Sequence, residues 1–393
     1  MSHDDFAREI LERIRRCLPH GDAFALHEPR FEANEWSYLK RCLDSGWVSS
    51  AGPFVDEFEA KICELTGARH AVATVNGTAA LHVCLKLAGV AANDEVIVPA
   101  LTFVATANAV SYCGAVPHFA EAAAATLGID AGRLADHLAK VAELRQGACY
   151  NGATGRRIRA VVPMHTFGHP SDLDGLERVC RDFGLALVED AAESLGSRYR
   201  GQHTGTRGVL GALSFNGNKI VTTGGGGALL TASPDLARAA RHLTTTARLD
   251  PRGWEFVHDA VGYNYRLPCL NAALGLAQLE ALPTLLARKQ ALAARYIREF
   301  SEFRGARMFE APDFADSNYW LNTLLLDADE ITGRDAVLTV LNENGIGARP
   351  VWRLMHRLPM YRDCPRMDLP VAEDLERRIV NVPSSPHLGR ELA

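Results

Sequence analysis

The sequence predicts an α/β protein with two parts: a large domain on a mainly parallel central sheet flanked by helices, and a smaller C-terminal α+β domain. Three observations lead to this prediction. From residue 34 onward, helical and extended patterns alternate along the 393-residue chain. The extended runs are rich in Val, Ile and Leu without alternating polarity, as expected of strands covered on both faces. After about residue 243 the alternation gives way to a polar stretch and a long helical region.

The first elements follow from the spacing of apolar residues. Helical patterns cover Asn34 to Ser45, Val55 to Leu65 and Gly77 to Leu87. Strands are expected at His70 to Val75, Glu95 to Val98, Arg159 to Met164 and Leu185 to Glu189. A further helix precedes the last of these strands, with Ser171 expected as its N-cap and Gly184 as its stop.

The later elements mark the expected domain boundary. Ser233 followed by Pro234 predicts a helix start, and a polar stretch runs through Arg266. The elements expected after it are a helix from Pro268 to about Arg304, a strand at Leu321 to Leu326, and a helix capped by Thr332 and ending at Gly345. We therefore predict a large domain over residues 1–250, including an N-terminal helix. Residues 251–393 are predicted to form an interdomain segment, the long helix and the small domain.

Composition and charge exclude several classes of protein. The 42 basic and 47 acidic residues give a formal net charge of -5, so no nucleic-acid partner is expected. The N-terminal residues carry charges throughout and lack the features of a secretory signal. Apolar runs such as Val96 to Val110 are too short for a membrane span, so no membrane association is expected. Nine cysteines without a CxxC pair fit reduced thiols, which predicts a cytoplasmic protein.

The strongest local signal is a lysine before a glycine-rich turn. Lys219 ends the segment SFNGNK and is followed by TTGGGG, whose glycines allow the backbone to approach a ligand closely. Lys219 is therefore a candidate nucleophile, the alternative being a solvated lysine beside a flexible loop. The glycine run is not a GxGxxG before a helix, and the sequence has no GxxxxGK[ST]. A dinucleotide or P-loop site is therefore not supported.

Two other segments supply complementary groups. Asp190 follows a predicted strand, and ligands of open parallel sheets lie beyond the carboxyl ends of the strands. A carboxylate there could keep a heterocyclic nitrogen protonated, although a helix-capping role is equally open. In NGTAAL, Gly77, Thr78 and Ala79 join a strand to a helix, where free amides and the helix dipole favour an anion. An amine able to form an imine, an acid and a phosphate cup together match the needs of pyridoxal phosphate.

Several motifs, in their order along the chain, resemble the DegT/DnrJ/EryC1/StrS family of sugar-nucleotide aminotransferases. These are GWVSSAGPFVDEFE, NGTAAL, PALTFVATANAV, VEDAAESLG, SFNGNK with TTGGGG, GYNYRLPCLNAALGLAQLE and VNVPSS. The resemblance runs from about Phe31 to Pro383. It implies the fold-type I class of pyridoxal phosphate enzymes and the activity of an aminotransferase.

The resemblance also assigns roles to individual residues. Lys219 matches the lysine that binds the cofactor covalently, Asp190 matches the acid that pairs with the ring nitrogen, and His165 matches a position near cofactor and substrate. The other cofactor positions implied are Gly77, Thr78, Ala79 and Ser214 around the phosphate, and Phe103 stacked on the ring. Asn264 matches a residue that reaches the phosphate from the neighbouring subunit, which implies a homodimer with shared active sites.

Other positions are less clear in their role. Glu193 stands where the family often has Gln or His near the phenolic oxygen of the cofactor, and an ionised carboxylate cannot donate a hydrogen bond there. His165 and His169 are four residues apart, but Gly168 and Pro170 disfavour a helix, so no metal site is expected. The implied substrate positions, each with packing or surface exposure as the alternative, are Trp47, Ser49, Ser50, Tyr319, Arg349, Trp352 and His356.

The implied reaction moves an amino group from L-glutamate, released as 2-oxoglutarate, to C4 of a nucleotide-linked 4-keto-6-deoxy sugar. SFNGNK with TTGGGG is most similar to the branch that acts on UDP-2-acetamido-4-keto-2,6-dideoxyhexose, for surface polysaccharide or glycan biosynthesis. GDP-perosamine synthesis and amination of a C3-ketosugar are the alternatives. Dehydratases of this family carry histidine in place of Lys219. An enzyme acting on amino acids or aminobenzoates and a non-catalytic cofactor-binding regulator are further alternatives.

Overall fold

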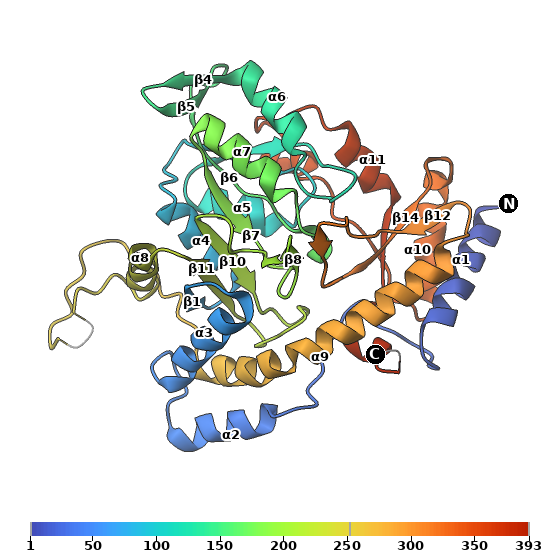
Figure 1. Cartoon of the computed structure of the whole chain (residues 1–393), viewed down its shortest axis with the longest axis horizontal. Coiled ribbons are helices and arrows are strands. Elements are labelled where there is room, and N and C mark those ends of the chain that lie inside the picture. Colours follow the sequence, from blue (N-terminus) through green and yellow to red (C-terminus); the bar gives the residue numbers. More distant parts are fainter. Residues whose placement is uncertain (1, 251–252, 392–393) are drawn as a thin grey trace.

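The computed structural model describes residues 2–250 and 253–391, which form a large sheet flanked by helices with a smaller unit beside it (Figure 1). The helices of the larger part are α2 (Glu35–Ser45), α3 (Pro53–Thr66), α4 (Gly77–Leu87), α5 (Val104–Tyr112), α6 (Ala131–Val141), α7 (Leu173–Phe183) and α8 (Pro234–Thr244). Its strands are β1 (His70–Thr74), β2 (Glu95–Pro99), β3 (Val116–Ala120), β4 (Ala142–Arg145), β5 (Ala148–Asn151), β6 (Arg157–Val161), β7 (Ala186–Asp190), β10 (Leu210–Ser214) and β11 (Gly227–Thr231).

These nine strands form one mixed sheet, and its central part is parallel as predicted. The order is β1-β11-β10-β7-β6-β2-β3, with β4 and β5 joined at β6. Each neighbouring pair from β10 to β3 is parallel, whereas β11 pairs antiparallel with both β10 and β1. The core strands β2 and β11 are buried at every residue, which explains why their sequences are mainly apolar and do not alternate in polarity. The parallel strands direct their carboxyl ends to one edge, where ligands bind in such sheets.

The helix α7 forms where expected, but its N-cap residue differs from the predicted one. Asp172, not Ser171, is the N-cap, and its Oδ1 accepts the backbone N–H of Gly175 at 3.1 Å. The Ser171 hydroxyl instead donates to the main-chain oxygen of Met164 at 3.1 Å. Gly184 ends the helix in the left-handed conformation, as predicted. Ser171 and Asp172 are both good N-cap residues, so the sequence alone does not fix the first residue of the helix. The Ser171 hydroxyl is used by the Met164 oxygen, and Asp172 therefore caps the helix.

The last predicted helix also starts differently. Thr332 lies inside a 3-10 helix, η2 (Ala328–Gly333), and α10 (Arg334–Glu343) follows it without a side-chain cap. The predicted cap at Thr332 is therefore wrong, because a tighter turn already occupies that position. The C-cap of α10 is Asn344, one residue before the expected Gly345.

The long helix α9 (Cys269–Phe300) connects the two parts of the molecule (Figure 1). Among the described helices it alone is long and apolar enough, by length and composition, to cross a bilayer. More than half of its most apolar stretch is buried inside the protein, where it packs against α2, α3 and α1. Gly275 allows the close approach to α3, because a Cβ there would lie 2.4 Å from a ring carbon of Phe58. The apolar face is thus used for packing within this chain.

The smaller unit is built on an antiparallel sheet. Its strands are β12 (Ala306–Met308), β14 (Asn322–Leu326), β16 (Ile379–Val382) and β15 (Arg349–Pro350), in that order across the sheet. Helices α10 and α11 (Pro370–Arg378) belong to this unit. A separate three-stranded sheet joins the parts, because β13 (Ala315–Asp316) pairs with β8 (Arg198–Tyr199), which pairs with β9 (Gln202–His203).

The N-terminal helix α1 (His3–Cys17) packs against the smaller unit. Its apolar residues, such as Phe6 and Ile10, share one buried cluster with Tyr296 of α9 and Val337 of α10. Figure 1 accordingly shows the N-terminus beside α10, far from the large sheet. The sequence-based division placed this helix with residues 1–250. We propose instead that α1 is part of the small domain, because its buried side chains complete that core.

Candidate active site

Asp190 lies at the carboxyl end of β7, in the parallel centre of the sheet. It is 5% exposed, and its carboxylate accepts hydrogen bonds from the Thr106 hydroxyl at 2.8 Å and the Ala192 backbone N–H at 3.2 Å. Burial raises the pKa of Asp190, whereas the Thr106 hydroxyl acts in the opposite direction. Among the described residues no helix directly follows Asp190, so the helix-capping alternative is wrong; the Ala192 amide and the Thr106 hydroxyl each bond to one carboxylate oxygen. A buried carboxylate of this kind stabilises a cation brought beside it.

Lys219 lies in the turn between β10 and β11, held by a hydrogen bond from its backbone N–H to the Asn216 oxygen at 3.0 Å. Its Nζ is 3.3 Å from Glu193 Oε1 and 3.8 Å from the centroid of the Trp320 ring. The side chain is 12% exposed. Lys219 is therefore a largely buried amine between an acid and an aromatic ring, and not a solvated lysine beside a flexible loop.

Glu193 is the second buried carboxyl group at this site. Its Oε2 accepts the backbone N–H of Phe167 at 2.9 Å, and Phe167 holds the positive φ of 56° that is unusual for a non-glycine residue. Burial raises the pKa of Glu193 to about 7, although the nearby Lys219 ammonium opposes this shift. Near neutral pH a share of the Glu193 groups carries a proton and can donate a hydrogen bond. The protonated form of Glu193 can therefore donate a hydrogen bond to the phenolic oxygen, which the ionised form cannot do.

The amino end of α4 forms another side of the site. Asn76 is its N-cap and accepts the Ala79 backbone N–H at 2.8 Å, so the Ala79 amide is already used. Gly77 packs closely on Ser214, because a Cβ on Gly77 would lie 2.8 Å from the Ser214 Cβ. Gly77 and Thr78 remain beside the cavity, at a helix end that favours an anion.

These groups surround one cavity of about 650 Å³. The predicted residues that line it are Gly77, Thr78, Phe103, Asp190, Glu193, Ser214, Lys219, Arg349 and Trp352. The cavity has the volume typical of small-molecule sites. Its donor set fits pyridoxal phosphate, which needs an acid for the ring nitrogen, an amine for the aldehyde and amides for the phosphate.

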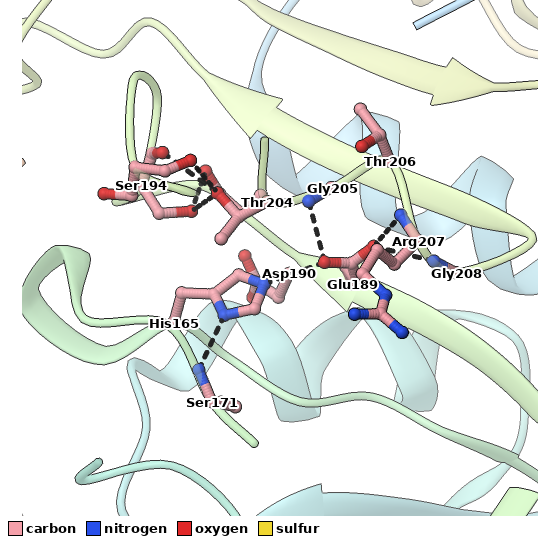
Figure 2. A network of polar contacts seen from close by, with 12 residues as sticks. His165, Ser171, Glu189, Asp190, Ser194, Thr204, Gly205, Thr206, Arg207 and Gly208 are labelled. Carbon is pink, nitrogen blue, oxygen red and sulfur yellow. Dashed lines mark hydrogen bonds and ion pairs between the residues drawn. The ribbon is translucent and has the colours of Figure 1, made fainter. Parts of the chain in front are cut away.

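His165 lies beside Asp190 but does not line the cavity (Figure 2). Its Nδ1 accepts the Ser171 backbone N–H at 3.1 Å, and its Nε2 is 3.0 Å from Glu189 Oε2. The Glu189 carboxylate is in turn held by three backbone amides, each at 2.7 Å, from Gly205, Arg207 and Gly208. Because both ring nitrogens have partners, His165 supports the strand end that carries Asp190 and offers no free nitrogen to a ligand.

The other predicted residues lie outside the cavity wall. These are Trp47, Ser49, Ser50, Ala79, Asn264, Tyr319 and His356. Trp47 and Asn264 are exposed, whereas Tyr319 accepts the Ala311 backbone N–H at 3.4 Å and His356 is 3.5 Å from Glu373. Within one chain, the structure therefore brings together the predicted cofactor residues other than Ala79 and Asn264, but only two of the predicted substrate residues, Arg349 and Trp352.

Sequence reasoning missed cavity residues supplied by the smaller unit and the N-terminal segment. Trp320, His27 and Asn381 all line the cavity. The aromatic pair of Tyr319 and Trp320 was an available signal, but Tyr319 adopts a positive φ of 46°, and a local reversal of this kind cannot be read from apolar spacing. His27 precedes α2 in irregular backbone, where no periodicity marks it.

Comparison with known proteins identifies the family. The family model described as the DegT/DnrJ/EryC1/StrS aminotransferase family matches residues 29–393. A GDP-perosamine synthase of Caulobacter vibrioides is 37% identical over 366 residues, covering 92% of this chain and 92% of that protein. A GDP-perosamine synthase of Vibrio cholerae is 34% identical over 364 residues, covering 92% and 94%.

Solved structures agree with this result. The aminotransferase TlmJ from Streptoalloteichus hindustanus matches with a TM-score of 0.83 and 30% identity, covering 94% of this chain and 96% of that one. DesI, solved with its TDP-sugar product, matches with a TM-score of 0.81 and 31% identity, covering 95% and 91%. The chain therefore belongs to the DegT/DnrJ/EryC1/StrS family, and it is a pyridoxal phosphate-dependent sugar aminotransferase of fold type I.

Proposed function

We propose that this enzyme transfers the amino group of L-glutamate to C4 of a nucleotide-linked 4-keto-6-deoxyhexose. The observation that carries the proposal is the convergence of Lys219, Asp190 and the amino end of α4 on one cavity. The relatives named GDP-perosamine synthase, at 33% to 37% identity, support a GDP-linked sugar as the acceptor. The motifs SFNGNK and TTGGGG support the UDP-linked 2-acetamido sugar as a second candidate.

The residues of the cavity divide into distinct roles. Pyridoxal phosphate, when bound, supplies an aldehyde that takes up the amino group and a ring that accepts electrons. Asp190 would keep the ring nitrogen protonated, because its buried carboxylate stabilises a cation. Gly77, Thr78 and Ser214 would bind the phosphate. Lys219 Nζ would hold the cofactor and, once released, move a proton at the substrate carbon that bears nitrogen.

The remaining wall residues would contact the ring and the sugar. Phe103 would cover one face of the cofactor ring, since it lines the cavity while remaining 46% exposed. Glu193, in its protonated form, would donate a hydrogen bond to the phenolic oxygen. Arg349 and Trp352, which come from the smaller unit, would contact the nucleotide sugar.

The experiment separates the two halves of the reaction. The cofactor-loaded enzyme is converted with L-glutamate, freed of glutamate, and mixed with a GDP-linked or a UDP-linked 4-keto-6-deoxyhexose. We expect the cofactor spectrum to return to its starting form and mass spectrometry to detect an amino sugar with the GDP compound. Conversion of the UDP compound alone would make the second candidate the substrate. Conversion of neither would overturn the proposal.

We further propose that the enzyme is a homodimer with shared active sites. Asn264 is exposed and does not line the cavity of its own chain, so its predicted contact with the phosphate requires a second copy. The neighbouring stretch exposes large apolar side chains, namely Leu249, Trp254, Phe256, Val257 and Val261. Trp254→Ser with Phe256→Ser should shift sedimentation toward a monomer and weaken cofactor retention. Wild-type sedimentation and retention would contradict this assembly.

A further inference from the structure

His27 is a cavity residue with unmet hydrogen-bonding capacity. It lines the cavity, and both ring nitrogens are buried without a hydrogen-bond partner in the part of the chain that the structure describes. His27 as a whole residue is partly accessible, although its two ring nitrogens are covered. His165, close to the same site, has partners at both nitrogens. Because buried polar atoms are normally paired, the two nitrogens of His27 point to a ligand.

The backbone around His27 is fixed on both sides. The Leu26 oxygen accepts the Ser384 backbone N–H at 2.7 Å, and the Glu28 backbone N–H donates to the Ser385 hydroxyl at 2.9 Å. These bonds attach the segment to the chain that follows β16 in the smaller unit. The His27 ring lies 6.4 Å from the ring of Trp320, which in turn covers Lys219. His27 is thus held in the wall that faces the reactive amine.

The surroundings keep this imidazole uncharged. Burial lowers the pKa of His27 well below 6.5, and the charges of Lys289, Lys219 and His387 act in the same direction. A neutral imidazole offers one N–H donor and one acceptor nitrogen. No carboxylate within the described residues bonds to either nitrogen, so the orienting partner of a histidine acid or base is absent. The ring therefore suits a neutral polar group.

The same cavity offers a different residue for an anionic group. Arg349 lines the cavity and makes no ion pair within the described chain. Its permanent charge and fork of donors match a diphosphate better than a neutral imidazole does. The two ring nitrogens of His27 are therefore available to hydrogen-bond the uncharged sugar of the acceptor.

We propose that His27 is a specificity-determining residue that hydrogen-bonds a hydroxyl or acetamido substituent on the hexose ring of the amino acceptor. Both substituents present a donor and an acceptor, which matches the two nitrogens of a neutral imidazole. This assignment rests on the proposed function, because it concerns the acceptor sugar. If this assignment is right, replacing His27 should slow the second half-reaction, with the ketosugar, and leave the rate of the first half-reaction, with L-glutamate, almost unchanged.

The test compares the two half-reactions in holoenzyme variants. His27→Phe retains a planar ring and removes both nitrogens, and His27→Gln retains a donor and an acceptor. We expect His27→Phe to lower kcat/KM for the ketosugar by roughly tenfold or more, mainly through KM, while the half-reaction with L-glutamate stays within about twofold. His27→Gln should recover part of the loss. The normal half-reaction with L-glutamate also shows that the variant is folded.

Analogues of the converted ketosugar, lacking the C2 or the C3 substituent, identify the bonded group. The wild-type enzyme should discriminate against one analogue by roughly tenfold, and His27→Phe should lose that discrimination. Equal losses in both half-reactions, or unchanged discrimination in His27→Phe, would overturn the assignment while leaving the proposed function intact. A wild-type enzyme that aminates no ketosugar would instead overturn the proposed function, and the assignment with it.

Discussion

Two lysines of this protein, one largely buried and one fully buried, lie in contrasting surroundings. Lys219 Nζ borders the cavity, beside the Glu193 carboxylate and over the Trp320 ring. Lys289 lies in the middle of α9, is 1% exposed and does not line the cavity. Its Nζ donates only to main-chain oxygens in the described structure, those of Ser384 at 2.5 Å and Trp320 at 3.1 Å.

The difference shows that burial does not by itself identify a reactive amine. Burial lowers the pKa of Lys289 well below 10.5, the direction that makes an amine nucleophilic, yet Lys289 does not line the active-site cavity. Lys219 combines access with two nearby acids, Asp190 and Glu193. Lys289 instead links Trp320, a cavity wall residue, to Ser384 in the chain that follows β16. We interpret Lys219 as catalytic and Lys289 as structural.

Replacing Lys219 tests this comparison most severely. Lys219→Ala should reduce kcat by about 10³-fold, because it removes both the covalent attachment of the cofactor and the proton carrier. Borohydride reduction of the wild-type holoenzyme, followed by peptide mass spectrometry, should find the cofactor on the peptide that contains Lys219. A label on Lys289, or a variant that turns over at the wild-type rate, would reverse the two assignments.

Asp190 should give the next largest effect. Asp190→Asn keeps a group that can accept from the Thr106 hydroxyl, but it removes the charge that stabilises a cationic ring nitrogen. We expect kcat to fall roughly 100-fold while the protein retains bound cofactor, measured from its visible absorbance. Loss of the cofactor together with the activity would mean that Asp190 serves binding and not electron withdrawal.

The same comparison explains what the sequence could predict. Lys219 and Asp190 sit next to strong local patterns, a glycine-rich turn and the end of an apolar strand, so their residue types and positions were readable. Three of the parallel strands, β2, β6 and β7, and the helix α4 were predicted for the same reason, whereas β3 and β10 were not. Local sequence patterns can therefore identify functional residues that lie within a single segment.

Cavity residues that are brought together only by tertiary packing could not be predicted from local sequence patterns. His27 and Trp320 reach the cavity because the chain before α2 and the smaller unit fold back onto the large sheet. His165 shows the converse, because its sequence position is near the site but its two ring nitrogens are paired with Ser171 and Glu189. Proximity along the chain does not fix the direction of a side chain.

Glu193 should give a smaller effect on activity and a clear effect of pH on stability. Its pKa rises from 4.5 to about 7 in the folded protein, because of burial. Between these values the folded chain binds a proton that the unfolded chain has lost, so Glu193 lowers stability as pH rises through this window. Glu193→Gln lacks this penalty.

Urea unfolding without cofactor measures that effect. The stability gained by Glu193→Gln should be larger at pH 8 than at pH 5, by roughly 1–3 kcal/mol. We expect kcat to change by about tenfold or less, since glutamine still donates a hydrogen bond. A gain that does not change between these pH values would mean that Glu193 titrates normally.

Lys289→Met should leave kcat close to the wild-type value and change only the dependence of stability on pH. Above the lowered folded pKa and below 10.5, the unfolded chain binds a proton that the folded chain does not, so wild-type stability rises with pH. The difference in unfolding free energy between wild type and Lys289→Met should therefore increase by up to about 1.4 kcal/mol per pH unit between pH 8 and 10. Lys140→Met, at an exposed position, is the matched control and should show no such slope. A flat difference would show that Lys289 keeps its proton in the fold, and a large loss of kcat would show that its bond to the Trp320 oxygen supports the active site directly.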